Sequence, residues 1–192
     1  MGRHDEAIGE IRRAQEISPR SPVIATAFAN VLFFAQRFVE ANEQCRRSLE
    51  LDPGSIPTHI VLRWTYEMRG MCNEALAVYE QERAFAGDAI NTRAKHAHVL
   101  ASCGRAEEAR EILQEIVARR DEQWVTAYEI AVIYGFLGER DEAFNWLMQA
   151  EQENAVGLTY IRVDPRINNL RNDPRFDELL KRRSSPADTT GG

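Results

Sequence analysis

The 192-residue sequence contains only three cysteines, no long apolar run and no excess of basic residues. Cys45, Cys72 and Cys103 are far apart and odd in number, so no pair has the short spacing of a zinc site or a redox dithiol. We therefore expect three unpaired thiols. This favours a reducing compartment, and hence the cytoplasm, although a periplasmic location also fits.

The chain also lacks the basic surface that binding to a nucleic-acid backbone needs. Its 24 Lys and Arg against 30 Asp and Glu give a formal net charge of −6. The longest apolar segment, residues 130–137, is far shorter than the roughly 20 residues of a membrane span. The N-terminus does not have the pattern of a signal peptide. We expect a soluble protein that binds neither nucleic acid nor membrane.

Motifs of catalysis and cofactor binding are missing too. His96 and His98 are two residues apart, so on a helix they point to different faces and cannot bind one metal ion together. The sequence has no glycine-rich phosphate loop and no serine or cysteine nucleophile motif. We predict no enzymatic activity, no metal and no cofactor.

What the chain does have is an alanine every 34 residues, at Ala7, Ala41, Ala75, Ala109 and Ala143. Other positions share this period. The residue four after each alanine is apolar, and glycine stands five before it at Gly70, Gly104 and Gly138. A small side chain allows two antiparallel helices to approach closely, and glycine suits the turn between them. A fixed period of this length indicates a helical repeat.

With these periodic positions, the chain resembles a tetratricopeptide-repeat protein over roughly residues 1–155. The segments WTYEMRGMCNEALAVYE and IAVIYGFLGERDEAFNWL are similar to the turn and second helix of that family. The resemblance implies an all-α, right-handed superhelix of antiparallel helix pairs that binds other proteins. The expected units are a half repeat at residues 1–20 and full repeats at 22–55, 56–89, 90–123 and 124–155.

The first unit lacks its first helix, which leaves Ala7, Ile8, Ile11 and Ala14 without a partner helix on one side. Three interpretations are open. In the first, the chain is the C-terminal piece of a longer protein. In the second, the surface that contains Ile8 and Ile11 pairs either with a second copy, as a homodimer, or with a segment in cis. In the third, the patch is small enough to stay exposed.

Residues 156–183 are expected to close the array. Asp164 and Asp173 each precede a proline, the pattern of a helix N-cap with proline at the first helical position. The second helix has Phe176, Leu179 and Leu180 on one face. This segment also resembles the one that closes repeat arrays in bacterial multidomain signalling proteins, which favours, as an alternative, a regulatory region with its partner in cis. Residues 184–192 are polar and small, and we expect a disordered tail.

The resemblance also indicates a binding groove, because in this family the first helix of each pair lines the concave face. Carried over by position, the groove contains Thr26, Asn30, Phe33, Ile60, Trp64, Glu67, Met68, Asn91, His98, Tyr128, Val132 and Phe136. Aromatic and apolar side chains along one seam suit an apolar or amphipathic peptide. The alternative is that some of them, Phe34 and Phe136 especially, pack between repeats instead.

A carboxylate clamp is not expected in this groove. Some family members hold a peptide's terminal carboxylate with Lys and Asn at fixed positions, and Asn30 matches one of these. The other positions hold Thr26, Trp64, Ala94 and His98. A carboxylate needs charged or amide donors to replace its water. The groove is therefore predicted to bind a peptide or partner segment mainly through apolar contacts.

Overall fold

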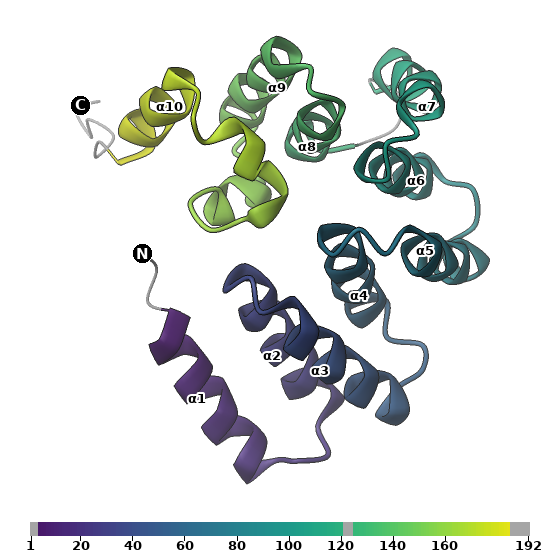
Figure 1. The fold of residues 1–192 in the computed structure, drawn as a ribbon, viewed down its shortest axis with the longest axis vertical. Coiled ribbons are helices and arrows are strands. Elements are labelled where there is room, and N and C mark those ends of the chain that lie inside the picture. Colours follow the sequence, from purple (N-terminus) through teal and green to yellow (C-terminus); the bar gives the residue numbers. More distant parts are fainter. Residues whose placement is uncertain (1–3, 121–124, 185–192) are drawn as a thin grey trace, which may run out of the picture. The chain divides into compact units, whose positions relative to one another are not determined.

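The structure, a computed structural model, describes residues 4–120 and 125–184. All regular structure in these ranges is helical (Figure 1). The helices are α1 (His4–Ile17), α2 (Pro22–Phe34), α3 (Phe38–Leu51), α4 (Ile56–Met68), α5 (Cys72–Ala86), α6 (Ile90–Ser102), α7 (Ala106–Ala118), α8 (Ala127–Leu137), α9 (Arg140–Gln152), the 3₁₀ helices η1 (Val156–Tyr160) and η2 (Pro165–Leu170), and α10 (Pro174–Ser184).

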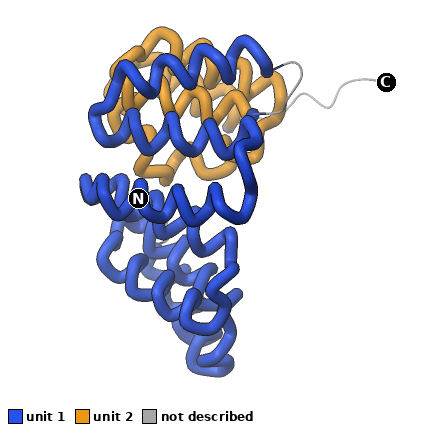
Figure 2. Tube along the Cα trace, turned by 90° about the vertical axis from the view of Figure 1, so that its right-hand side faces the viewer, with its two compact units in different colours: residues 1–125 blue, residues 126–192 orange. Residues whose placement is uncertain are grey.

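Consecutive helices pack in pairs, as the 34-residue period predicts: α2 with α3, α4 with α5, α6 with α7, and α8 with α9. The all-α helical-repeat fold is confirmed. The chain forms two compact units, residues 1–125 and 126–192 (Figure 2). Residues 1–3 and 121–124, and residues 185–192 of the tail expected at 184–192, lie outside the described residues, whereas Ser184 is the last residue of α10.

The turns between paired helices use left-handed backbone where the sequence supplies glycine. Gly70, Gly104 and Gly138 have φ of 66°, 75° and 77°. In the first full repeat the same position is Gln36, which takes φ 59° without being glycine. Helix starts follow the expected chemistry as well, since the Ser21 hydroxyl accepts a hydrogen bond from the Ile24 amide with Pro22 at the first helical position.

The periodic alanines lie where the helices of a pair cross. Ala41, Ala75, Ala109 and Ala143 are all 0% exposed. We predict that Ala109→Leu lowers the free energy of unfolding by ~1–3 kcal/mol, because the added carbons have no space between α6 and α7. Urea denaturation measures it. Ala118→Leu, at the exposed end of the same helix, is the control. Equal stability of both variants and the wild type would refute the proposed register.

The expectation of three unpaired cysteines is wrong. Cys72 and Cys103 form a disulfide with Cα atoms 5.7 Å apart. Cys72 begins α5 and Cys103 caps α6, so a sequence separation of 31 residues, close to one repeat, brings neighbouring turns together. The argument for a reducing compartment therefore no longer holds. Cys45 remains free and buried, and burial raises its pKa to about 12.

Candidate functional site

Six of the twelve predicted groove residues are buried. They are Thr26, Phe33, Glu67, His98, Tyr128 and Val132, each at most 8% exposed. Five are half-buried, namely Asn30, Ile60, Trp64, Met68 and Phe136, and Asn91 is exposed. Half of the predicted groove residues are thus used for packing and polar contacts inside the two units.

Thr26 lies in a buried cluster of hydroxyl groups. Its Oγ1 is 2.9 Å from Ser48 Oγ and 2.6 Å from Thr58 Oγ1, and it donates to the Pro22 carbonyl oxygen at 2.9 Å. These side chains come from α2, α3 and α4. Because each hydroxyl can both donate and accept, the cluster satisfies its members without water and joins two repeats.

Glu67 and His98 belong to a buried ion cluster that joins α4, α5 and α6. Arg63 contacts Glu67 at 2.5 Å and Glu82 at 3.2 Å; His98 Nδ1 is 2.7 Å from Glu67, and Lys95 Nζ is 2.6 Å from Glu82. The side chains of Arg63, Glu67, Glu82 and His98 are at most 3% exposed.

The ionisation of Glu67 follows from these neighbours. Burial by itself would raise the pKa of Glu67, but the nearby charges of His98 and Arg63 outweigh burial and hold the pKa below its usual range. Arg63 and its partners therefore form a structural ion cluster between repeats.

Tyr128 is buried in unit 2 under the C-terminal segment. Its hydroxyl donates a hydrogen bond to Asp164 Oδ2 at 2.8 Å. The backbone of Gly157 crosses the ring so closely that a Cβ atom there would overlap it. Burial raises the pKa of Tyr128 well above its usual value, and the Asp164 charge adds to this. Tyr128 therefore holds the C-terminal segment and is not presented to a ligand.

Two Asp-Pro-Arg motifs attach that segment to α8 and α9. In the first, Asp164 accepts from the Arg166 backbone amide at 3.0 Å and from its guanidinium at 2.7 Å, and the guanidinium also reaches Glu129 at 3.1 Å. Asp164 is 0% and Arg166 4% exposed. The motif combines a helix cap with a buried ion pair.

The second motif repeats this arrangement at the surface. Asp173 accepts from the Arg175 amide at 3.1 Å and from its guanidinium at 2.8 Å. Arg175 also contacts Asp141 at 2.8 Å and lies 4.3 Å from the Phe144 ring centroid. The expected apolar face of α10 is buried at Phe176 and Leu179. The two helix caps could be predicted from the sequence. The contacts of the two arginines could not, and their only indication in the sequence is that the Asp-Pro-Arg motif occurs twice.

Four of the five predicted groove residues that remain accessible in unit 1 lie on α2 and α4, which pack against each other, and the fifth, Asn91, lies on α6. We call Asn30, Ile60, Trp64 and Met68 the α2–α4 surface. Ile60, Trp64 and Met68 are four residues apart and so form one stripe along α4. The Trp64 ring packs on buried Phe33, with centroids 5.5 Å apart. A partly exposed apolar stripe that contains an indole ring can bury an apolar side chain of a partner.

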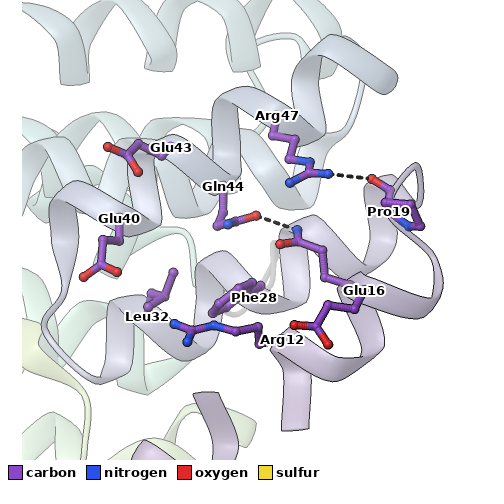
Figure 3. A pocket seen from close by; sticks show the side chains of 10 residues that line it. Arg12, Glu16, Pro19, Phe28, Leu32, Glu40, Glu43, Gln44 and Arg47 are labelled. Carbon is purple, nitrogen blue, oxygen red and sulfur yellow. Dashed lines mark hydrogen bonds between the residues drawn. The ribbon is translucent and has the colours of Figure 1, made fainter. Parts of the chain in front are cut away.

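Unit 1 also has a cleft of about 420 Å³ that sequence reasoning missed (Figure 3). Its floor is Phe28 and Leu32 of α2. Its walls are polar side chains of α1 and α3 together with Pro19 of the turn between α1 and α2, with a Gln15–Gln44 hydrogen bond of 2.7 Å across it. Acidic and basic side chains both line the cleft, so it does not favour a ligand of one charge. The 34-residue period does not predict this cleft, because the cleft depends on the spacing between helices.

No cluster of three or more His, Cys, Asp and Glu side chains within residues 4–120 and 125–184 is placed to hold a metal ion. None of the described helices combines the length and apolar character required to cross a membrane.

No protein-family model matches the sequence, and no curated protein does either. Among solved structures, a tetratricopeptide repeat protein from Parabacteroides merdae matches with a TM-score of 0.65 at 14% identity, covering 85% of this chain and 64% of that one. This chain has the tetratricopeptide-repeat fold. It spans just under two thirds of the length of the Parabacteroides protein.

Two further solved structures match with lower TM-scores. YrrB, described as a TPR protein with an unusual peptide-binding site, matches at 17% identity over 89% of both chains, with a TM-score of 0.49. The APC/C hetero-tetramer Cut9–Hcn1 matches at 12% identity over 95% of this chain and 46% of that one, with a TM-score of 0.39. The tetratricopeptide-repeat fold of the present chain rests on the first match and on its own helix pairs.

Proposed function

We propose that this chain is a non-enzymatic protein-interaction module that binds a peptide or partner segment on the α2–α4 surface. The observation that carries the proposal is the half-buried stripe of Ile60, Trp64 and Met68 on α4, with half-buried Asn30 on the neighbouring helix α2. Aromatic and apolar anchors in partly formed recesses supply most of the binding free energy at protein interfaces.

The proposed partner is an apolar or amphipathic polypeptide, not a nucleic acid or a membrane. The net charge of −6 opposes a phosphate backbone. The apolar stripe suits side chains spaced along an amphipathic segment, and the single amide of Asn30 offers one directional hydrogen bond. No cofactor is needed for this function.

An alternative keeps the same surface but puts the partner in cis, in a larger bacterial signalling protein. It is favoured by the two Asp-Pro-Arg motifs, because residues 156–183 resemble the segment that closes repeat arrays in such proteins. In that arrangement the repeats regulate a neighbouring domain and need not capture a separate protein.

The proposal predicts that Trp64→Ala and, separately, Ile60→Glu reduce partner capture at least about tenfold while helical content is unchanged. The measurement is affinity capture from lysate, quantified by mass spectrometry and followed by circular dichroism of each variant. Val39→Glu is the matched control, since Val39 is 56% exposed on α3. A partner retained equally by all variants would place binding elsewhere. No partner even for the wild type would favour the alternative in cis.

A further inference from the structure

Helices α5 and α6 are joined at both ends. At one end the short turn of residues 87–89 connects them. At the other end Cys72, the first residue of α5, forms a disulfide with Cys103, which follows the last residue of α6. Between these ends the two helices pack on each other (Figure 1), and the Tyr79 ring stacks on His96 with centroids 4.5 Å apart. The pair therefore forms a covalently closed loop for as long as the disulfide is intact.

This loop crosses the boundary between two helix pairs. Helix α5 pairs with α4, and α6 pairs with α7, so the disulfide connects one pair to the next. At the preceding boundary, between α3 and α4, the residues 34 positions earlier are Phe38 and Arg69, which cannot form such a bond. Within unit 1 the covalent link is therefore particular to the boundary between α5 and α6.

The linked boundary is also the one with charges in its interior. The ion cluster centred on Arg63 and Glu67 joins α4, α5 and α6. Removing paired charges from water costs much of the free energy that their attraction returns, so a buried ion cluster holds helices together less well than apolar packing of similar size. The preceding boundary has uncharged contacts, among them Phe33 on the Trp64 ring. The boundary at α5 and α6 consequently depends more on its covalent link.

The turn at the other end of the loop can act as a pivot. Gly87 follows α5 with φ of 70° and ψ of −168°, a backbone conformation that residues with a Cβ atom rarely adopt. A Cβ atom built on Gly87 would meet nothing within 4 Å, so the space beside the turn is open. Rotation about this glycine moves the far ends of α5 and α6 apart once no bond joins them.

The disulfide can be reached by a thiol from solution. Cys72 and Cys103 are both half-buried, whereas Cys45 is 0% exposed. Burial raises the pKa of Cys45 to about 12, which leaves almost no thiolate to attack the disulfide from within the chain. Since these are the three cysteines of the sequence, Cys72 and Cys103 form its single dithiol–disulfide couple, and exchange requires an external thiol.

We propose that Cys72–Cys103 is a redox-controlled latch, which holds α5 and α6 together when oxidised and lets them separate about the turn at Gly87 when reduced. A thiolate of a dithiol reductant attacks one sulfur, and the other cysteine leaves as a thiolate. The second thiol of the reductant then displaces the first cysteine. Two electrons and two protons pass to the chain, and the reductant becomes a disulfide; a disulfide oxidant reverses the exchange. The latch involves no residue of the α2–α4 surface, so either proposal can fail without the other.

Hydrogen exchange of the whole chain with and without dithiothreitol tests the latch. On reduction, amides in residues 72–86 and 90–102 should exchange at least about tenfold faster, because opening of this pair no longer has to break a covalent loop. Residues 22–34 and 38–51 should be unaffected. Oxidised glutathione should restore slow exchange. Unchanged exchange in α5 and α6, equal acceleration in all four segments, or failure of reoxidation to restore protection would overturn the proposal.

Two controls assign the effect to these sulfur atoms. The Cys72→Ser/Cys103→Ser double variant should exchange like the reduced wild type and should not respond to dithiothreitol; a response of this variant would show that the reductant acts elsewhere. Wild-type chain treated with dithiothreitol and then iodoacetamide gives the same comparison without a substitution. Under native conditions the label should reach Cys72 and Cys103 but not buried Cys45. If Cys72 and Cys103 stay unlabelled until the chain is denatured, the disulfide is a permanent link and not a latch.

Discussion

Asp164→Ala is expected to lower the free energy of unfolding by about 3–5 kcal/mol, the usual cost of leaving a buried charge without its partner. Asp164 is completely buried and accepts hydrogen bonds from Tyr128 and Arg166. Without it, the 4%-exposed Arg166 keeps only Glu129, whose side chain is 36% exposed. Urea denaturation monitored by far-ultraviolet circular dichroism gives the change.

The matched control for this variant is Asp173→Ala, in the second Asp-Pro-Arg motif. Its cap and ion pair have the same geometry, but the Arg175 side chain is 41% exposed and water can solvate it after the change. We therefore expect a clearly smaller loss. If Asp173→Ala costs as much as Asp164→Ala, burial of the first motif is not what makes it important.

The first motif also makes the stability of the folded protein depend on pH, through Asp164. Burial alone would raise the pKa of Asp164, but the charge and hydrogen bonds of Arg166 outweigh it, so the pKa is lowered on folding. Because the folded pKa lies below the unfolded one, the stabilisation is present above the unfolded pKa of about 4 and is lost as pH falls through the folded value. Asp164→Ala should show a weaker loss of stability on acidification than the wild type.

Glu67→Ala is expected to destabilise the protein by a similar amount, about 3–5 kcal/mol, because it removes the carboxylate that contacts both Arg63 and His98. These side chains are almost fully buried. Chemical denaturation is again the measurement. Glu108→Ala, in the exposed ion pair with Arg105, is the control and should give no measurable change.

A double-mutant cycle separates the ion cluster from simple loss of volume. Arg63→Met combined with Glu67→Leu should cost less than the sum of the two single changes, since each single change leaves a buried charge and the double change leaves an apolar pair. Lys95 still faces Glu82 in the double variant. Additive costs would show that Arg63 and Glu67 do not act as a pair.

The 34-residue period correctly predicted the features that occur once in each repeat. Ala41 and its equivalents lie at helix crossings, Gly70 and its equivalents adopt positive φ, and Ser21 caps its helix, because each role follows from local sterics and hydrogen bonding. The same register could not tell which large side chains face a neighbouring repeat. Phe33 and Tyr128 stand at groove positions, yet both are buried by contacts that come from other elements.

Pairings between repeats were equally hidden in the sequence. The Cys72–Cys103 disulfide depends on how two turns lie side by side, and the contact of Arg166 with Glu129 spans 37 residues. Short-range spacing rules carry no information on such distances. The exposure of Ala7, in contrast, could be anticipated, because a half repeat leaves one helix face without its usual neighbour.

Hydrogen exchange with and without the captured partner shows whether α2 and α4 form the binding surface. We predict slower exchange in residues 22–34 and 56–68 on binding, with little change in residues 38–51 and 72–86. Protection confined to the latter two segments, on α3 and α5, would contradict it.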